Sequence, residues 1–448
     1  MGAFLLAQNP DRIVYATIFL AFLSVPNSFP TSFYVMGVQV RFYEPFLVMS
    51  VCYVALRYRR RSRFGVTGIV LAIAFGVVLA ILLSNPVSRI YIDTRLFIYL
   101  PMAYFVASRF FVIVNTRAVL RMIPWVLWIS AISTIAASAL GSKLAQMQSE
   151  AAGSTAEATR LIGPATYAAV VVVSGVIALV IGGYATIRET WIYWTPALPL
   201  MLLSFSRNIL ISIFVAGLFA LVASRSWPAV VRLIRTVVVT VLGLGLLYWS
   251  LSGLAGIPGV SWIQAQADGF LIRVVGGIGG QAINQDGSAQ FRFQQENAYL
   301  VAEIYESPLW GHGFGFAYKP INTGRAISDK SENLQYYAHN FYLWILVKAG
   351  LVGFLLMLIP IARVLGAALR GGGPVRLATG AAAAGLLAVS IVAPMPLGSP
   401  TAVLLGLVIG ACAGASAVDR RQGGKPSPHR TREPIVAAAG YDLQKQNS

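Results

Sequence analysis

The sequence predicts an all-α polytopic integral membrane protein with about twelve transmembrane helices and one large external loop. Hydrophobic residues make up 57% of the 448 residues and charged residues only 11%, whereas a soluble domain carries about a quarter charged residues. The hydrophobic residues fall in long blocks, and about 20 such residues let a helix cross a hydrocarbon layer about 30 Å thick. The basic residues lie between these blocks, so the net charge of +18 indicates membrane topology and not nucleic-acid binding.

Nine spans are predicted within residues 1–250. Each is an apolar block between charged or Pro- and Gly-rich breaks, and they lie near residues 12–28, 43–57, 66–84, 96–112, 120–139, 164–183, 192–204, 208–223 and 230–250. The first block lacks the basic region and cleavage site of a signal peptide, so we interpret it as a retained span. Cys52 and Cys412 both lie in apolar blocks, which excludes a disulfide framework.

Residues 251–338 are predicted to form the large external loop. Within it, Phe291–Glu306 has apolar residues at nearly helical spacing, which predicts an amphipathic helix lying on the membrane domain. The glycine-rich stretches Gly276–Gly287 and Pro308–Gly324 predict flexible joints on either side. Residues 339–418 follow with spans near 339–360, 376–394 and 398–416, and the polar residues 419–448 predict a disordered tail.

The arginines between the spans predict the orientation. The densest basic cluster, within Arg57–Arg63, is placed in the cytoplasm by the positive-inside rule. Basic residues recur in every second loop after it, so both termini are predicted to be cytoplasmic. The segments at 142–163 and 251–338 then face outward, and we expect the functional residues there.

Three arginines on the predicted outer side are candidates for an anion site. Arg207 interrupts two apolar blocks at the outer end of the eighth span. A guanidinium near membrane depth is costly and usually faces a wet cavity with an anionic partner, most naturally a phosphate. The alternative is an arginine that extends to lipid headgroups. Arg292 opens the amphipathic helix and Arg160 precedes the sixth span; each alone is more typical of a solvated surface residue.

His339, at the start of the tenth span, is one of three histidines. An imidazole with an ordinary pKa near 6.5 can accept a proton from an attacking hydroxyl at neutral pH. The alternative is an interfacial histidine among the tyrosines of an aromatic belt. His312, in a glycine-rich turn, and His429, in the tail, are weaker candidates, and Asp329 or Glu332 is the next candidate base.

Neither a nucleotide nor a metal site is predicted. The glycine runs Gly276–Gly280 and Gly311–Gly315 lack the strand and the Gly-Lys-Ser/Thr ending of a phosphate-binding loop. The nearest paired carboxylates in an outer loop are Glu303 and Glu306, and a divalent cation usually needs oxygens from more than two residues. We therefore expect neither cofactor nor metal.

Several short motifs together resemble the family of bacterial O-antigen ligases and polymerases, which are polytopic glycosyltransferases. The family's Ser-Arg at the start of a span resembles Ser206-Arg207-Asn208-Ile209-Leu210, and its Arg-led external helix with a following Pro and Gly-x-Gly turn resembles Arg292 through Gly313. The His-Asn that starts the next span resembles His339-Asn340, and Arg160-Leu161-Ile162-Gly163-Pro164 is a looser likeness. The motifs cover the second half of the chain, whereas the first half is similar only in hydropathy.

The resemblance implies a metal-independent glycosyltransferase of the bacterial inner membrane with a periplasmic active site and a glycan donor linked to undecaprenyl diphosphate. It implies that His339 is the general base and that Arg207, Arg292 and Arg160 bind the diphosphate. One large loop favours the ligase, whose acceptor is the lipid A-core oligosaccharide, over the polymerase and, third, a protein O-oligosaccharyltransferase. The implied partners are donor, acceptor and membrane lipids.

The alternative from another class is a transporter or lipid flippase. Such proteins usually have repeated halves and ionisable residues near mid-membrane. The sequence has neither a convincing repeat nor a clear carboxylate in the middle of a span, which favours the transferase.

Overall fold

A computed structural model describes residues 9–35, 38–58, 65–113, 116–145, 160–253, 259–275, 291–319 and 335–421. Helices dominate the described residues, which confirms the predominantly helical fold. The first nine are α2 (Arg12–Phe22), α3 (Tyr43–Arg57), α4 (Thr67–Leu82), α5 (Val87–Ile113), α6 (Thr116–Ala139), α7 (Pro164–Gly182), α8 (Trp191–Leu202), α9 (Asn208–Ser224) and α10 (Trp227–Gly253). The segment predicted to be external contains α11 (Val260–Phe270), the π-helical turns η1 (Leu271–Val275) and η3 (Phe291–Glu296), and α14 (Asn297–Glu306). After it come α15 (Phe341–Leu369), α16 (Pro374–Val389), the short η5 (Met395–Leu397) and α17 (Ser399–Arg421).

Each of the twelve predicted spans overlaps one of these helices. Among the described residues, five helices are long and apolar enough to cross a membrane, namely Val87–Phe111, Ala118–Ala139, Pro164–Gly182, Trp227–Ser250 and Phe341–Leu369. Shorter apolar helices accompany them. These helices indicate a membrane-embedded protein. The number of twelve spans and their orientation remain predictions.

Small residues let α17 lie directly against α5. A Cβ added at Gly406 would lie 2.3 Å from the carbonyl oxygen of Leu100, and one at Gly410 would lie 2.5 Å from that of Tyr104. Close backbone approach through small residues is a common way for helices to associate in a membrane, where burial in lipid supplies little driving force. The spacing of four residues between the two glycines places both on one face of α17.

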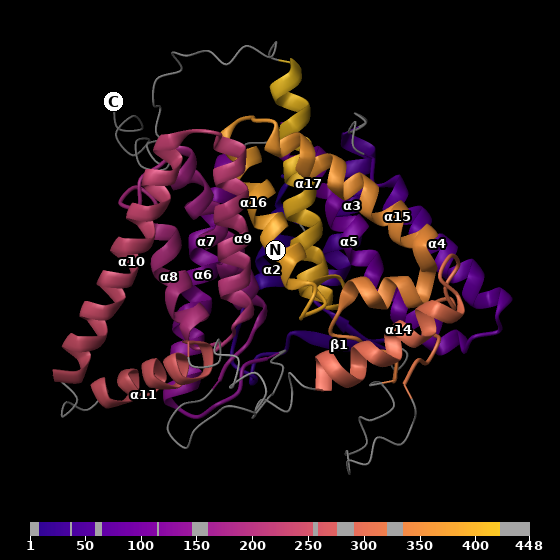
Figure 1. The fold of residues 1–448 in the computed structure, drawn as a ribbon, viewed down its shortest axis with the longest axis horizontal. Helices are drawn as coiled ribbons and strands as arrows, with labels where there is room; N and C mark the ends of the chain where they lie inside the picture. Colours follow the sequence, from indigo (N-terminus) through magenta and orange to yellow (C-terminus); the bar gives the residue numbers. More distant parts are fainter. Residues whose placement is uncertain are drawn as a thin grey trace.

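The helix α15, which overlaps the span predicted near 339–360, is broken at Gly350. Gly350 has φ of +60°, which favours glycine, and a Cβ there would lie 2.3 Å from the carbonyl oxygen of Leu309. The break separates a short arm, residues 341–349, from a longer arm, residues 351–369 (Figure 1). Helix α15 also contacts α14.

The all-α prediction omitted one hairpin. Strands β1 (Ser32–Val35) and β2 (Val38–Arg41) pair in antiparallel register, with Ser32 opposite Arg41. Aromatic and β-branched residues in both strands favour this conformation. The hairpin, α11 and α14 lie together at one end of the helix bundle, and the C-terminal end of α17 projects at the opposite end (Figure 1).

The described part of the segment after α14, residues 307–319, is packed against the bundle, whereas its glycines predicted a flexible joint. His312 N donates to the carbonyl oxygen of Val347 at 2.8 Å, and Gly313 N donates to that of Lys348 at 2.8 Å. Gly313 has φ of +79°, and a Cβ there would lie 2.5 Å from the backbone of Ala80. Glycine is required here for close approach, which composition alone does not distinguish from flexibility. The other predicted joint, Gly276–Gly287, lies outside the described residues.

Candidate functional site

The polar groups at this end of the bundle centre on Glu296, the last residue of η3. Its side chain is fully buried. Its Oε2 lies 2.9 Å from His339 Nδ1 and also accepts a hydrogen bond from His339 N at 2.9 Å. Its Oε1 accepts a hydrogen bond from the Lys319 ammonium, which also donates to the carbonyl oxygen of Tyr337 at 2.9 Å. Glu296 therefore ties the segment before α14 to the start of α15.

This contact fixes the orientation of the His339 ring. An ionised carboxylate only accepts hydrogen bonds, so Nδ1 carries the proton and the neutral ring keeps its lone pair on Nε2. The His339 side chain is 23% exposed, and the Tyr337 ring packs edge-on at 5.2 Å between centroids. The arrangement presents a positioned proton acceptor at the rim of the bundle.

Opposing effects set the charge of Glu296. Burial raises its pKa, but the hydrogen bond from His339, the charge of His339 when its ring is protonated, and the charge of Lys319 outweigh burial and lower the pKa to about 2. Burial lowers the pKa of Lys319, and the Glu296 charge opposes that change. Glu296 is therefore an anion at neutral pH, which keeps the proton of the imidazole on Nδ1.

Sequence reasoning missed Glu296 and Lys319. One signal was present, because Glu296 follows Arg292 by four residues and so shares a face of the predicted helix. Nothing local connects that face to His339, which lies 43 residues further on. Asp329 and Glu332, named as alternative bases, lie outside the described residues.

Arg160 and Arg207 lie at the turn between α8 and α9. Arg160 Nε donates to the carbonyl oxygen of Ser204 at 3.0 Å. Arg207 immediately precedes α9, and its Nε donates to the carbonyl oxygen of Arg273 in η1 at 3.0 Å. Both arginines are half-buried, and a backbone carbonyl oxygen holds the Nε of each.

The third predicted arginine, Arg292, belongs to η3, one turn before Glu296. Its side chain lies outside the described part of the chain. The backbone places Arg292 in the same short π-helical segment as Glu296, four residues earlier.

The end of α16 connects the arginine turn to the His339 group. Phe341 N, two residues after His339, donates to the carbonyl oxygen of Ser390 at 2.9 Å. Val389, one residue earlier, lines a small cavity together with Asn208, which follows Arg207. Both groups thus lie at the same end of the bundle, where α11 and α14 also lie (Figure 1).

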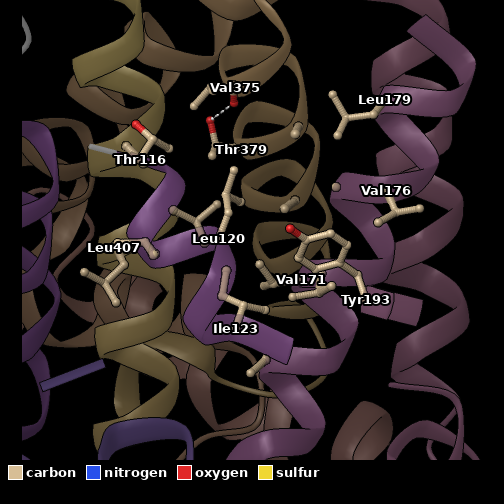
Figure 2. A pocket seen from close by; sticks show the side chains of 18 of the residues that line it. Thr116, Leu120, Ile123, Val171, Val176, Leu179, Tyr193, Val375, Thr379 and Leu407 are labelled. Carbon is tan, nitrogen blue, oxygen red and sulfur yellow. Dashed lines mark hydrogen bonds between the residues drawn. The ribbon is translucent and has the colours of Figure 1, made fainter. Parts of the chain in front are cut away.

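A larger cavity of about 260 Å³ lies between the helices and is almost wholly apolar. Figure 2 shows its lining from α6, α7, α8, α16 and α17, including Ile123, Val176 and Leu407. Along α7 the lining runs from Ala168 to Leu179, about 16 Å of helix. Protein interiors are normally close-packed, so a space of this size and polarity suits a hydrocarbon chain.

Comparison with known proteins agrees with the motifs. Residues 197–358 match a family model described as O-antigen ligase. The matched stretch contains Arg207, Glu296 and His339 and excludes Arg160. No curated protein gave a significant match to the chain. The similarity to the O-antigen ligase family is therefore established for residues 197–358.

Proposed function

We propose that the protein is an O-antigen ligase, which moves a glycan from undecaprenyl diphosphate to the lipid A-core oligosaccharide at the periplasmic face of the bacterial inner membrane. The observation that carries this proposal is the contact between Glu296 and His339 within the matched family domain. A buried anion that orients an imidazole with its lone pair on Nε2 suits deprotonation of an acceptor hydroxyl.

In the proposed reaction, a hydroxyl oxygen of the acceptor sugar attacks the anomeric carbon of the donor glycan. The bond from that carbon to the diphosphate oxygen breaks, and undecaprenyl diphosphate leaves with the electron pair. The hydroxyl proton moves to His339 Nε2. Glu296 stabilises the imidazolium as it forms, in the way that a buried carboxylate supports the histidine of hydrolytic triads.

The leaving diphosphate requires positive charge. Arg207 and Arg160 lie at one turn at the same end of the bundle as His339, and Arg292 belongs to the helix of Glu296. Guanidinium groups bind phosphate oxygens through charge-assisted hydrogen bonds and stabilise charge that develops on the leaving group. These three arginines would supply the positive charge that a metal ion provides in many glycosyltransferases.

The apolar cavity supports a lipid-linked donor. Its lining begins at Ala168, about one turn after α7 starts at Pro164, and Arg160 precedes that start by four residues. A polyprenyl chain in the cavity with its diphosphate near Arg160 and Arg207 fits this order. The cavity volume of about 260 Å³ accommodates only part of such a chain, so the remainder would lie in the bilayer.

Purified protein in detergent tests the proposal in two reactions. One contains lipid-linked donor and a truncated lipid A-core acceptor, and the other contains the donor alone. Glycan on the core in the first reaction is the expected result. Longer lipid-linked glycan in the second would instead identify a polymerase, and no product in either would contradict the glycosyltransferase assignment. Asp268→Asn, in α11, is a suitable control because the Asp268 carboxylate accepts a hydrogen bond from Tyr248 Oη of α10 at 2.8 Å and belongs to none of the proposed site groups.

A further inference from the structure

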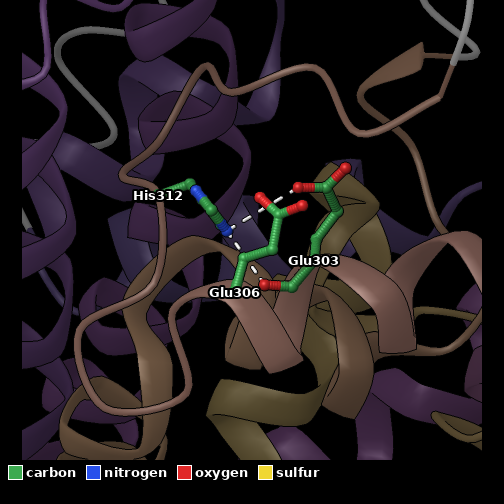
Figure 3. Close-up of side chains that lie close together, drawn as sticks. All are labelled: Glu303, Glu306 and His312. Carbon is green, nitrogen blue, oxygen red and sulfur yellow. Dashed lines mark hydrogen bonds and ion pairs between the residues drawn. The ribbon is translucent and has the colours of Figure 1, made fainter.

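We infer that the end of α14 and the turn after it form a binding site for a divalent transition-metal ion of the Zn²⁺ type, with Glu303, Glu306 and His312 as ligands. The three side chains point toward one another (Figure 3). They belong to two segments, because Glu303 and Glu306 lie on α14 and His312 lies in the glycine-rich turn. The inference is independent of the glycan-transfer reaction.

The spacing of the donor atoms fits one ion. One ligand atom from each side chain lies within 4.8 Å of the other two. His312 Nε2 lies 3.7 Å from Glu303 Oε2 and 2.9 Å from the main-chain oxygen of Glu303. Ligands about 2.0 to 2.2 Å from a zinc ion are themselves roughly 3 to 3.5 Å apart. Small rotations of the glutamate side chains therefore suffice to bring all three onto one ion.

The charges around the cluster favour a cation. Glu303 and Glu306 lie in the last turn of α14, where the negative end of the helix dipole disfavours carboxylates. Burial raises the pKa of Glu303, and the neighbouring Glu306 charge raises it further. Within the described residues, neither carboxylate forms an ion pair with lysine or arginine, and the basic side chain beside Glu303 is that of His312. A divalent ion would neutralise both carboxylates at once.

Backbone hydrogen bonds and a ring contact fix the position of His312, as a metal-binding site requires. Its backbone N donates to the carbonyl oxygen of Val347 at 2.8 Å, and its own carbonyl oxygen accepts from Asn85 Nδ2 at 2.8 Å. Its ring stacks on Phe316 with centroids 4.3 Å apart. The backbone hydrogen bonds and the ring stacking hold the His312 imidazole in one orientation.

The combination of one imidazole nitrogen with two carboxylates indicates the class of metal. Imidazole suits zinc and other transition metals, whereas magnesium and calcium prefer oxygen ligands alone. In the structure His312 Nε2 lies within hydrogen-bond distance of the Glu303 carbonyl oxygen, so ion binding requires that nitrogen to bind without a proton.

We expect the bound ion to stabilise the fold and not to take part in glycan transfer. Glu296 and Glu303 are seven residues apart, which is about 10 Å along a helix, so the ion would not touch the His339 group. It would instead fix the end of α14 to a turn that is anchored on α15 through Val347. This refines the metal-free expectation from the sequence, which counted two carboxylates and set His312 aside.

Zinc titration of the purified full-length protein tests this inference. The protein is freed of its affinity tag, stripped with chelator and titrated by calorimetry, in parallel with Glu306→Gln and the control Asp268→Asn. Glu306 is exposed, so its substitution leaves the core unchanged. We expect one zinc per chain in wild type and Asp268→Asn, with a higher melting temperature when zinc is bound. Glu306→Gln should bind about 100-fold or more weakly, because even indirect partners of a metal contribute about 10- to 100-fold.

Equal zinc affinity in Glu306→Gln, or no saturable binding in wild type, would overturn the site. Magnesium binding as tight as zinc binding would overturn the transition-metal assignment. A second variant, His312→Gln, should also lose zinc affinity while keeping the carboxylates, and retained affinity there would count against the site. The assay contains neither donor nor acceptor, so its failure leaves the proposed transfer reaction untouched.

Discussion

Two buried lysine–carboxylate pairs in this protein differ in what surrounds them. Lys348 Nζ lies 2.8 Å from Asp93 Oδ2 and 2.7 Å from the carbonyl oxygen of Phe316, and the same Asp93 oxygen accepts from Gly315 N at 2.8 Å. Glu296, by contrast, shares its carboxylate between Lys319 and the His339 ring. The first pair fixes backbone, whereas the second orients a partly exposed titratable ring. Burial of an ion pair therefore does not mark a reactive group unless a neighbour presents an accessible reactive atom.

The Asp93 pair was not anticipated from the sequence. Asp93 lies in the first third of the candidate span Val87–Phe111, and Lys348 lies in the first third of Phe341–Leu369. Both side chains are buried. Since their partners are each other and main-chain groups of the segment after α14, the pair explains how that segment is held. It gives no support to a transporter.

The largest effect is expected from breaking the structural pair. Lys348→Met removes the ammonium group from the buried Asp93 carboxylate, which then keeps the hydrogen bond from Gly315 N. Loss of one partner of a buried ion pair typically costs about 3 to 5 kcal/mol of stability. The melting temperature and yield of the purified variant should fall sharply. Replacing both residues, as Asp93→Leu with Lys348→Met, should restore part of the stability because no unpaired charge remains. A stable but inactive Lys348→Met protein would contradict the comparison, because it would show that the Asp93–Lys348 pair acts in the reaction and not in folding.

Glu296→Gln keeps the shape of the side chain and an oxygen that can accept from Lys319, so it should lose less stability than Lys348→Met and should bind donor but transfer glycan slowly. The amide can turn its N–H toward Nδ1, which favours the tautomer with the proton on Nε2 and removes the acceptor. A comparable loss of the orienting carboxylate costs about 10⁴ in kcat in serine proteases, and we expect at least about tenfold here. Steady-state kinetics should show the loss in kcat with little change in KM. Normal kcat would mean that Glu296 is as structural as Asp93.

Arg207→Lys should reduce transfer about tenfold or more, because a point-charge ammonium cannot reproduce the bidentate contact of a guanidinium with a diphosphate. Arg292→Lys should also be impaired. Kinetics at varied donor concentration would measure both. If both lysine variants work at nearly the wild-type rate while the alanine variants fold normally, general electrostatic attraction suffices and the bidentate account is wrong.

The smallest expected effect is that of a chelator on the reaction rate. Transfer in EDTA, measured well below the melting temperature, should equal transfer without it, because the arginines supply the positive charge. The chelator should lower only the melting temperature if an ion occupies the Glu303 site. Loss of transfer in EDTA that magnesium or manganese restores would show that the reaction itself needs a metal.

Local patterns were enough to predict most of the helices and the candidate histidine. Apolar blocks are contiguous in the chain, so each predicted span overlaps a helix of the structure. The amphipathic pattern of Phe291–Glu306 corresponds to η3 and α14. The break at Gly350 was not predictable, because its cause is a contact with Leu309 from another segment. The partners Glu296 and Lys319 were missed for the same reason, since only the fold brings them to His339.

Transfer by purified His339→Gln is the measurement that tests the central claim most directly. Glutamine keeps much of the hydrogen-bonding shape of the side chain but accepts no proton at neutral pH. With Asp268→Asn as the active control, and with folding and donor binding verified, we expect transfer to fall about 10²- to 10⁴-fold, the usual contribution of one positioned base. A general base acts in the transition state, so donor binding should be nearly unchanged. Transfer by His339→Gln at close to the wild-type rate would contradict the claim that the Glu296–His339 pair removes the proton.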